Sequence, residues 1–241
     1  MNWLLWKEYR LNRLIVLVGV FLLLFPYAVA AGLLAWHWRP VGAEIHGARL
    51  WQYWRLLAPL WWSRMVWAAL YSLGISQLTF GLLGGSAIAG ERVDRSAEFL
   101  AYLPLSRGRI LAAKLLFTLA VSAVIWLPNL VILGISVLVL AVKAGDGASI
   151  LANITATGLV FFGVGWLLST MTESPSISVC VGLVVPVIVL TAICGVGYLA
   201  DLPADSHYPP YISLWYQVVS MAIALASFGA GTVYYLRRVE P

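Results

Sequence analysis

The sequence predicts an all-α integral membrane protein with six transmembrane helices, and three observations support that prediction. Hydrophobic residues make up 62% of the 241 residues and charged residues only 10%, whereas a soluble domain is about half apolar and about a quarter charged. The mean hydropathy is +0.91. Six stretches almost free of charge are long enough to cross a bilayer, which takes roughly 20 apolar residues. These features exclude a soluble domain. The net charge is only +5 and the basic residues are few, which argues against a surface that binds nucleic acid.

Each predicted span is an apolar run that no charged residue interrupts outside its end turns, because a charge at mid-membrane costs about 2.5–3.5 kcal/mol. Lys114 is the deepest charged residue, one turn into the third span, and we expect its long side chain to reach back to the interface. We treat residues 1–241 as one transmembrane domain. The predicted spans, in chain order, are Leu14–Trp36, Met65–Ala89, Leu111–Val142, Ala148–Thr170, Ser176–Leu199 and Ile212–Leu236.

Basic residues predict that both termini lie inside the cell, because cytoplasmic loops carry an excess of Lys and Arg. With the N-terminus inside, ten of the fifteen basic residues fall on the inner side. These ten are Lys7, Arg10, Arg13, Arg92, Arg95, Arg107, Arg109, Lys114, Arg237 and Arg238. The sequence therefore favours an N-in, C-in protein of the cell membrane, in contact with lipid.

The first outer loop is rich in tryptophan, which prefers the head-group layer of a membrane. Seven of the twelve tryptophans lie here, namely Trp36, Trp38, Trp51, Trp54, Trp61, Trp62 and Trp67. Trp51 and Trp54 share a helical face, so a short helix lying on the outer surface is plausible. Tryptophan clusters also occur in haem-handling membrane proteins, which leaves a redox role as an alternative.

Proline, glycine and serine mark local features of the spans. Pro128 and Pro186 lie inside the third and fifth spans, where each removes a backbone hydrogen bond, so we expect kinks. Ser174 and Pro175 are typical of the N-cap and first residue of a helix. In the second span, Gly81, Gly85 and Ala89 form a ridge of small residues that lets another helix approach closely. Packing within the bundle is a better explanation of that ridge than a contact between subunits.

The motifs of soluble catalysis are missing from the sequence. There is no G-x-x-x-x-G-K-[ST] segment for nucleotide phosphates and no H-E-x-x-H segment for zinc. The three histidines fall in or beside outer loops, which suits a haem between facing helices poorly. We therefore expect no catalytic residues, no metal site and no cofactor on this chain.

The inner loop between the second and third spans is the densest polar segment. Its apolar spacing predicts a short helix over about Ser96–Leu103. Pro104 ends that helix, because the residue before a proline disfavours helical geometry. Ser106 is suited to cap the third span, and Arg107 to hold the start of that span at the lipid surface. The loop is either a simple connection or a docking element for a cytoplasmic partner.

The same loop resembles that of type 2 ABC-transporter permeases, whose pattern is a Gly-Glu pair, a charged stretch, a Leu-rich turn, Leu-Pro-x-Ser-Arg, an aliphatic residue and a Lys. The matching positions are Gly90, Glu91, Glu98, Leu100, Leu103, Pro104, Ser106, Arg107, Ile110 and Lys114. Arg95 and Ser96 depart from it, since Gly-Thr is usual there. The opening Trp6-Lys7-Glu8-Tyr9-Arg10 is similar to the family's amphipathic helix on the inner surface.

The resemblance implies a permease subunit of an ATP-driven exporter, with ATP and Mg²⁺ bound by a separate cytoplasmic ATPase. A second permease copy, or a related chain, would complete the membrane domain. It also implies that the loop carries a coupling helix that contacts the ATPase, and that Lys7, Glu8 and Arg10 lie on the inner-surface helix. The implied coupling residues are Glu91, Arg92, Glu98, Phe99, Leu100, Leu103, Pro104, Ser106 and Arg107.

Two other classes of function stay open on the sequence. A haem- or quinone-binding membrane anchor of a redox complex would use the tryptophans and histidines. A scaffold or assembly subunit without transport would show no response to nucleotide.

Overall fold

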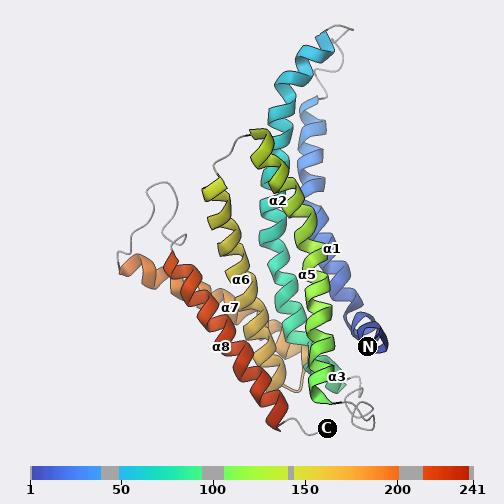
Figure 1. The fold of residues 1–241 in the computed structure, drawn as a ribbon, viewed down its shortest axis with the longest axis vertical. Coiled ribbons are helices and arrows are strands. Elements are labelled where there is room, and N and C mark those ends of the chain that lie inside the picture. The colour runs from blue at the N-terminus through green and yellow to red at the C-terminus, as the bar shows by residue number, and fades with distance from the viewer. Residues whose placement is uncertain (1, 39–48, 94–105, 141–143, 201–213, 239–241) are drawn as a thin grey trace.

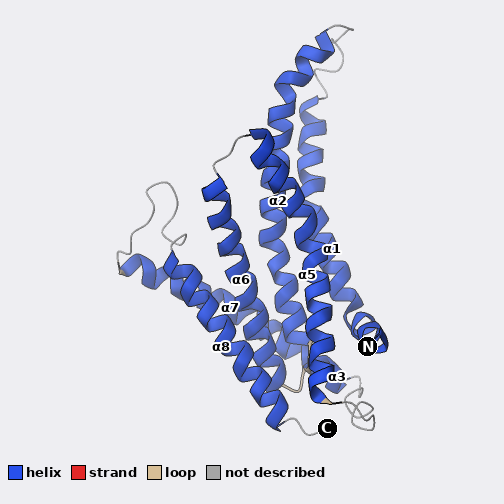
Figure 2. Ribbon diagram, in the orientation of Figure 1, coloured by secondary structure: helices blue, strands red, loops and turns tan. Residues whose placement is uncertain are grey.

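The computed structural model describes residues 2–38, 49–93, 106–140, 144–200 and 214–238, and describes no side chains for residues 2, 37–38, 49–57, 93, 137–140, 144–147 and 238. Every regular element in this part of the chain is a helix (Figures 1 and 2). The helices are α1 (Asn2–Trp38), α2 (Arg49–Ser86), α3 (Ala89–Val93), α5 (Arg107–Leu140), α6 (Ala144–Met171), α7 (Pro175–Leu199) and α8 (Leu214–Arg238).

Six of these helices are long and apolar enough to cross a membrane, as the sequence predicts. The spanning portions are Trp3–Trp36, Ala58–Ser86, Arg107–Ser136, Ala148–Met171, Pro175–Leu199 and Leu214–Arg237. Figure 1 shows that α1 begins and α8 ends at the same end of the bundle, where α3 also lies. We call this the basal end.

Helices α2 and α6 form the centre of the bundle. α2 packs against α1, α5, α6 and α7, and α6 packs against α2, α7 and α8. In the most apolar 18-residue stretch of each helix, 56% of the residues of α2 and 44% of those of α6 are buried, against 17–28% in the other four spans. The outer helices therefore face the surroundings with most of their apolar side chains, as lipid contact requires.

Glycines allow the central helices to approach closely, which confirms that the small-residue ridge packs within the bundle. A Cβ on Gly81 would lie 2.9 Å from the Leu183 side chain, and one on Gly85 would lie 3.0 Å from Val179 Cα, both on α7. A Cβ on Gly84 would lie 2.5 Å from the Phe162 carbonyl oxygen of α6. Without a hydrophobic force between helices in lipid, such close van der Waals contact holds the bundle together.

The two surface helices predicted from the sequence are continuous with the spans that follow them, and their place on the membrane surface stays a prediction. Residues 2–13 are the first turns of α1, and residues 49–57 are the first turns of α2. In the first turns of α1, Leu4 and Glu8 are buried, while Trp3 and Trp6 are exposed. α2 continues through Pro59, and membrane helices tolerate proline in this way.

The remaining local predictions concern prolines and a cap. Pro128 and Pro186 lie inside α5 and α7, and both helices continue through them. The kinks expected at these two residues stay a prediction. Ser174 is the N-cap of α7 and its side chain accepts from the Ile177 N–H, with Pro175 as the first helical residue. That cap confirms the helix start predicted from Ser174 and Pro175.

Candidate coupling site at the basal end

The loop singled out in the sequence begins and ends at the basal end of the bundle. α2 ends at Ser86, a short turn leads into α3, and α5 begins at Arg107. Of the predicted coupling residues, the structure describes Glu91, Arg92, Ser106 and Arg107. The short helix expected over Ser96–Leu103 lies outside the described residues, as do Glu98, Phe99, Leu100, Leu103 and Pro104.

Four charged residues meet inside the basal end, and we call them the basal charge cluster: Lys7, Glu8, Glu91 and Lys114. Lys114 Nζ lies 3.1 Å from Glu91 Oε1 and 3.2 Å from Glu8 Oε1. Lys7 Nζ donates a hydrogen bond to Glu91 Oε1. Glu8, Glu91 and Lys114 are each less than 5% exposed. The cluster joins α1, α3 and α5, and its two positive and two negative charges cancel.

Lys114 corrects one prediction from the sequence. Its side chain was expected to reach the membrane interface, but it is 3% exposed and also donates to the Ala87 carbonyl oxygen. Two carboxylates from other helices lie within reach of the ammonium group, and a charge is found buried where such partners compensate it. Two other residues predicted for the inner-surface helix differ in their surroundings. Glu8 binds Lys114 within the cluster, whereas Arg10 is exposed and its guanidinium lies 5.6 Å from the centre of the Trp6 ring.

The surroundings of Glu91 favour its charged form. Burial acts to raise the pKa of Glu91, but the nearby Lys114 and Lys7 outweigh burial and hold this pKa below its ordinary value. A carboxyl whose pKa is lower in the folded protein than in the unfolded chain stabilises the fold at pH values above its ordinary pKa. This contribution is lost as the pH falls through the lowered value. Glu91 is therefore ionised at neutral pH, and the ion pairs of the cluster are intact there.

The turn between α2 and α3 is fixed to α6 by a serine that the sequence analysis did not single out. Ser169 Oγ accepts the backbone N–H groups of Ile88 at 2.8 Å and of Ala89 at 3.0 Å. Ser169 is fully buried. Ile88 lies in the turn after α2 and Ala89 is the first residue of α3, so one hydroxyl holds the point where the loop begins.

Two arginines at the ends of the loop bind the ends of other spans. Arg92 donates to the carbonyl oxygens of Thr172 at 2.7 Å and Thr170 at 3.0 Å, at the end of α6. Arg107 lies 3.4 Å from the Tyr235 carbonyl oxygen and 3.3 Å from that of Leu236, near the end of α8. Cations at helix C-termini satisfy free carbonyls and interact favourably with the helix dipole. Ser106 precedes α5, and its carbonyl accepts from Arg109 N at 2.9 Å.

The base of the loop is thus connected to all six spans. Ser178 Oγ of α7 donates to the Gly85 carbonyl oxygen at 2.7 Å, just before the turn. Ser86 Oγ donates to Asn12 Oδ1 of α1 at 3.0 Å. A displacement of the loop would therefore act on every helix of the bundle at once. Sequence reasoning found Glu91, Arg92 and Arg107 but missed Ser169, Ser178 and Asn12, because a single polar residue in an apolar run carries no spacing signal.

Comparison with known families matches residues 74–235 to the family described as ABC-2 family transporter protein. This match covers more than half of the chain. The chain belongs to the ABC-2 transporter family. The matched region of this ABC-2 protein contains the described loop ends and Lys114, whereas Lys7 and Glu8 precede it. No curated protein and no solved structure matches the chain.

Membership of the ABC-2 family, together with the six apolar helices, makes the chain a multi-pass membrane protein of a transporter. It gives no support to the haem- or quinone-binding alternative.

We predict that replacing Ser169 of this ABC-2 protein by alanine lowers the free energy of unfolding by about 1–2 kcal/mol. The substitution leaves the N–H groups of Ile88 and Ala89 without their buried acceptor, and an unsatisfied buried donor costs about 1–3 kcal/mol. Thermal unfolding in detergent measures the effect. Ser176→Ala is the matched control because Ser176 is exposed near the start of α7, and equal melting temperatures for the two variants would contradict the prediction.

Proposed function

We propose that the chain is the membrane-spanning, non-catalytic permease subunit of an ATP-driven exporter in the cell membrane. The basal end faces the cytoplasm, which matches the excess of basic residues predicted for the inner side. A separate ABC ATPase binds ATP and Mg²⁺ and docks on segment 91–107. A second permease copy, or a related chain, completes the membrane domain. Export is the direction that the resemblance to type 2 permeases favours.

The observation that carries this proposal is the set of contacts at the base of the loop in an ABC-2 family protein. Lys114 and Lys7 bind Glu91, Ser169 holds the turn, and Arg92 and Arg107 bind the ends of α6 and α8. A rigid connection of this kind converts a push on the loop into a rigid-body movement of packed helices. A loop that merely joined two spans would need none of these contacts.

The test is a mild-detergent pull-down of the tagged chain from its native membranes, followed by mass spectrometry and an ATPase assay. We expect an ATP-binding subunit to co-purify with the wild type. Leu103→Asp, which places a charge on an expected apolar anchor, should reduce that association at least about tenfold, because losing a central anchor of an interface costs about 2 kcal/mol or more. Glu98→Lys should leave membrane insertion intact while uncoupling ATP hydrolysis from transport.

The matched control is Leu199→Asp, the same chemical change at an exposed leucine at the end of α7. This variant should keep the ATPase bound. Co-purification that is unchanged in Leu103→Asp, or lost equally in Leu199→Asp, would reject the docking assignment. A coloured complex, or one without any ATP-binding subunit, would reject the function itself.

A further inference from the structure

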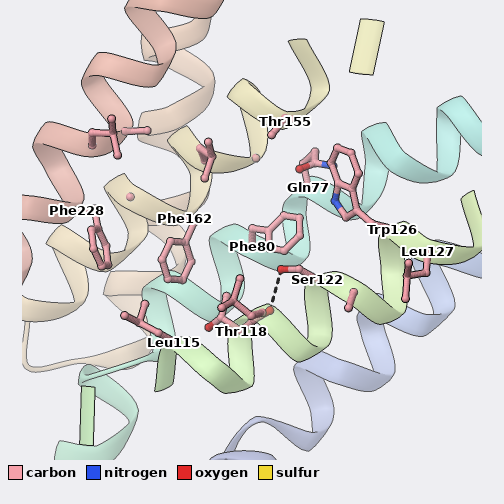
Figure 3. Close-up of a pocket in the computed structure, with 17 residues that line it drawn as sticks. Gln77, Phe80, Leu115, Thr118, Ser122, Trp126, Leu127, Thr155, Phe162 and Phe228 are labelled. Atoms are coloured by element: carbon pink, nitrogen blue, oxygen red, sulfur yellow. Dashed lines mark hydrogen bonds between the residues drawn. The ribbon is translucent and has the colours of Figure 1, made fainter. Parts of the chain in front are cut away.

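A cavity of about 650 Å³ lies between α2, α5, α6 and α8 (Figure 3). Its volume falls in the range of about 300–1,000 Å³ that small-molecule sites occupy. α5 packs on α1 and α2, whereas α8 packs on α6 and α7, so the cavity opens where these two groups of helices diverge. Leu119 and Leu127 of α5 and Leu225 of α8 line it and are each at least 60% exposed. The cavity therefore opens sideways toward the lipid.

The wall of the cavity is apolar and aromatic. Phe80, Trp126, Phe162 and Phe228 contribute one ring from each of the four helices, and Figure 3 shows them around the same space. None of the described lining residues is Asp, Glu, Lys, Arg or His. An ion at this depth would have no counter-charge, which is costly in a membrane. The wall thus fits the apolar body of an uncharged molecule.

Gln77 places one unsatisfied acceptor in this wall. Its side chain is 2% exposed, and its Nε2 donates to the Leu73 carbonyl oxygen of the same helix. Its Oε1 has no hydrogen-bond partner among the described residues and is buried against α6 with less than 1 Å² exposed, so a small turn of the amide is needed to present it to the cavity. A Cβ on Gly158 would lie 1.9 Å from that oxygen, so only glycine at this position of α6 leaves room for it. An unsatisfied polar atom costs several kcal/mol in lipid, where no water is available, and this points to a ligand that donates to it.

The hydroxyl groups of the wall are also hydrogen-bond acceptors, like Gln77 Oε1. Thr118 donates to the Lys114 carbonyl oxygen at 3.0 Å, Ser122 to that of Thr118 at 2.8 Å, and Thr155 to that of Leu151 at 2.7 Å. Each hydroxyl proton is therefore used within its own helix, and the oxygen lone pairs are left as acceptors. A ligand whose polar group only accepts hydrogen bonds gains nothing from these side chains, whereas a donor does.

We propose that the cavity binds an uncharged amphipathic molecule with an apolar body and a hydroxyl or amide N–H group that donates to Gln77 Oε1. The assignment of this molecule as transport substrate rests on the proposed function, but its binding does not. A smaller cavity of about 270 Å³, lined by Asn153, Thr157 and Tyr216, shares Gln77 as a wall. The unsatisfied Asn153 Oδ1 gives this second cavity an acceptor as well. The two cavities form a series of acceptor sites along α2 and α6.

The test uses the purified chain alone, without nucleotide, in vesicles of phosphatidylcholine. The probe is a long-chain alcohol with a diazirine on its alkyl chain, compared with its methyl ether and with the matching alkyl trimethylammonium ion. We expect the alcohol to label peptides of α2, α5, α6 and α8 at about tenfold lower concentration than the ether. Tenfold corresponds to about 1.4 kcal/mol, within the range measured for hydrogen bonds in membranes. Equal labelling by alcohol and ether, or stronger labelling by the cation, would overturn the proposal.

Three variants locate the site. Gln77→Met keeps the shape of the side chain and should remove the preference for the alcohol over the ether. Ala123→Phe fills the cavity from an exposed lining position and should remove labelling by both. Thr191→Met changes an exposed hydroxyl on α7 that also donates within its own helix, and should change neither. Labelling only at other peptides would overturn the proposal. If either cavity variant fails to fold, the comparison of alcohol with ether on the wild type still decides the proposal.

Two additions distinguish the sources of such a ligand. Diacylglycerol supplies a hydroxyl-bearing membrane lipid, and unlabelled long-chain alcohol supplies a solute that partitions into the bilayer. Competition by diacylglycerol as well as by the alcohol would identify a lipid, and competition by the alcohol alone a solute. Because no ATPase is present, loss of alcohol binding overturns only this inference, whereas absence of an ATPase in the pull-down overturns only the proposed function.

Discussion

Replacing Lys114 by methionine is expected to lower the free energy of unfolding by about 3–5 kcal/mol, because breaking a buried ion pair leaves its partner charge without compensation. Lys114 is 3% exposed and lies within 3.2 Å of both Glu8 and Glu91. Without it, the basal charge cluster holds two carboxylates and one ammonium group. Thermal and denaturant unfolding in detergent measure the loss. Arg109→Gln is the control, since it removes an exposed cation from the same helix, and a similar loss in both variants would contradict the prediction.

Double variants test whether charge balance explains this loss. Adding Glu8→Gln to Lys114→Met leaves the Lys7–Glu91 pair intact and restores neutrality. Adding Glu91→Gln also restores neutrality but removes the carboxylate that Lys7 binds. We therefore expect Glu8→Gln to rescue stability better than Glu91→Gln. Failure of both changes to rescue stability would show that the geometry around Lys114, rather than the net charge, sets the cost, and the reverse order would show that the Lys7–Glu91 pair contributes less than the rest of the cluster.

The pH dependence of the Lys114→Met variant gives an independent readout. In the wild type, burial raises the pKa of Glu91, but the charges of Lys114 and Lys7 hold it below its ordinary value. Removing Lys114 weakens this opposition, so the pKa of Glu91 should rise. The closer this folded-state pKa lies to the ordinary value, the less stability Glu91 loses as the pH falls, so the wild type loses more than the variant. The gap in melting temperature between variant and wild type should narrow on acidification from pH 7 toward pH 5.

The six spans could be predicted because charged residues are costly in lipid, so each span is a long apolar run almost free of charge. Every predicted span corresponds to a helix of the structure, and Ser174 and Pro175 locate the start of α7 to the residue. The ends of α1 and α2 could not be placed in the same way. Once a helix leaves the apolar layer, its continuation depends on neighbours in space, as with Glu8, which turns inward to Lys114.

The candidate site was predictable only where its residues carry a sequence pattern. Glu91, Arg92 and Arg107 belong to a dense polar loop, so they stand out from the apolar chain. Ser169 and Lys114 act through partners 80 or more residues away, or on another helix, in contacts that no local spacing encodes. Gln77 is similar: one glutamine in an apolar helix is unremarkable until its free oxygen is found beside Gly158. These contacts come from tertiary packing, which a single sequence does not reveal.

Replacing Gly84 by alanine is expected to lower the free energy of unfolding by about 2–3 kcal/mol, at the upper end of the cost of overpacking a tight core. The new Cβ would lie 2.5 Å from the Phe162 carbonyl oxygen and 3.0 Å from Trp166 N. Both atoms belong to the backbone of α6, so no side chain can rotate away and the two central helices must separate. The separation would also disturb the adjoining stack of Phe162, Trp166 and Phe228, whose ring centres lie 5.5–6.0 Å apart.

Gly74→Ala is the matched control for this prediction, because it makes the same change in the same helix at a position where a Cβ would meet nothing within 4 Å. Alanine is favoured over glycine in helices by about 0.8–1.0 kcal/mol, so this variant should be as stable as the wild type or slightly more stable. Both proteins gain one methyl group and the same helix propensity, and they differ only in the distance to α6. Equal melting temperatures would therefore mean that the contact between α2 and α6 is looser than these distances require, and that Gly84 does not set the separation of the two helices.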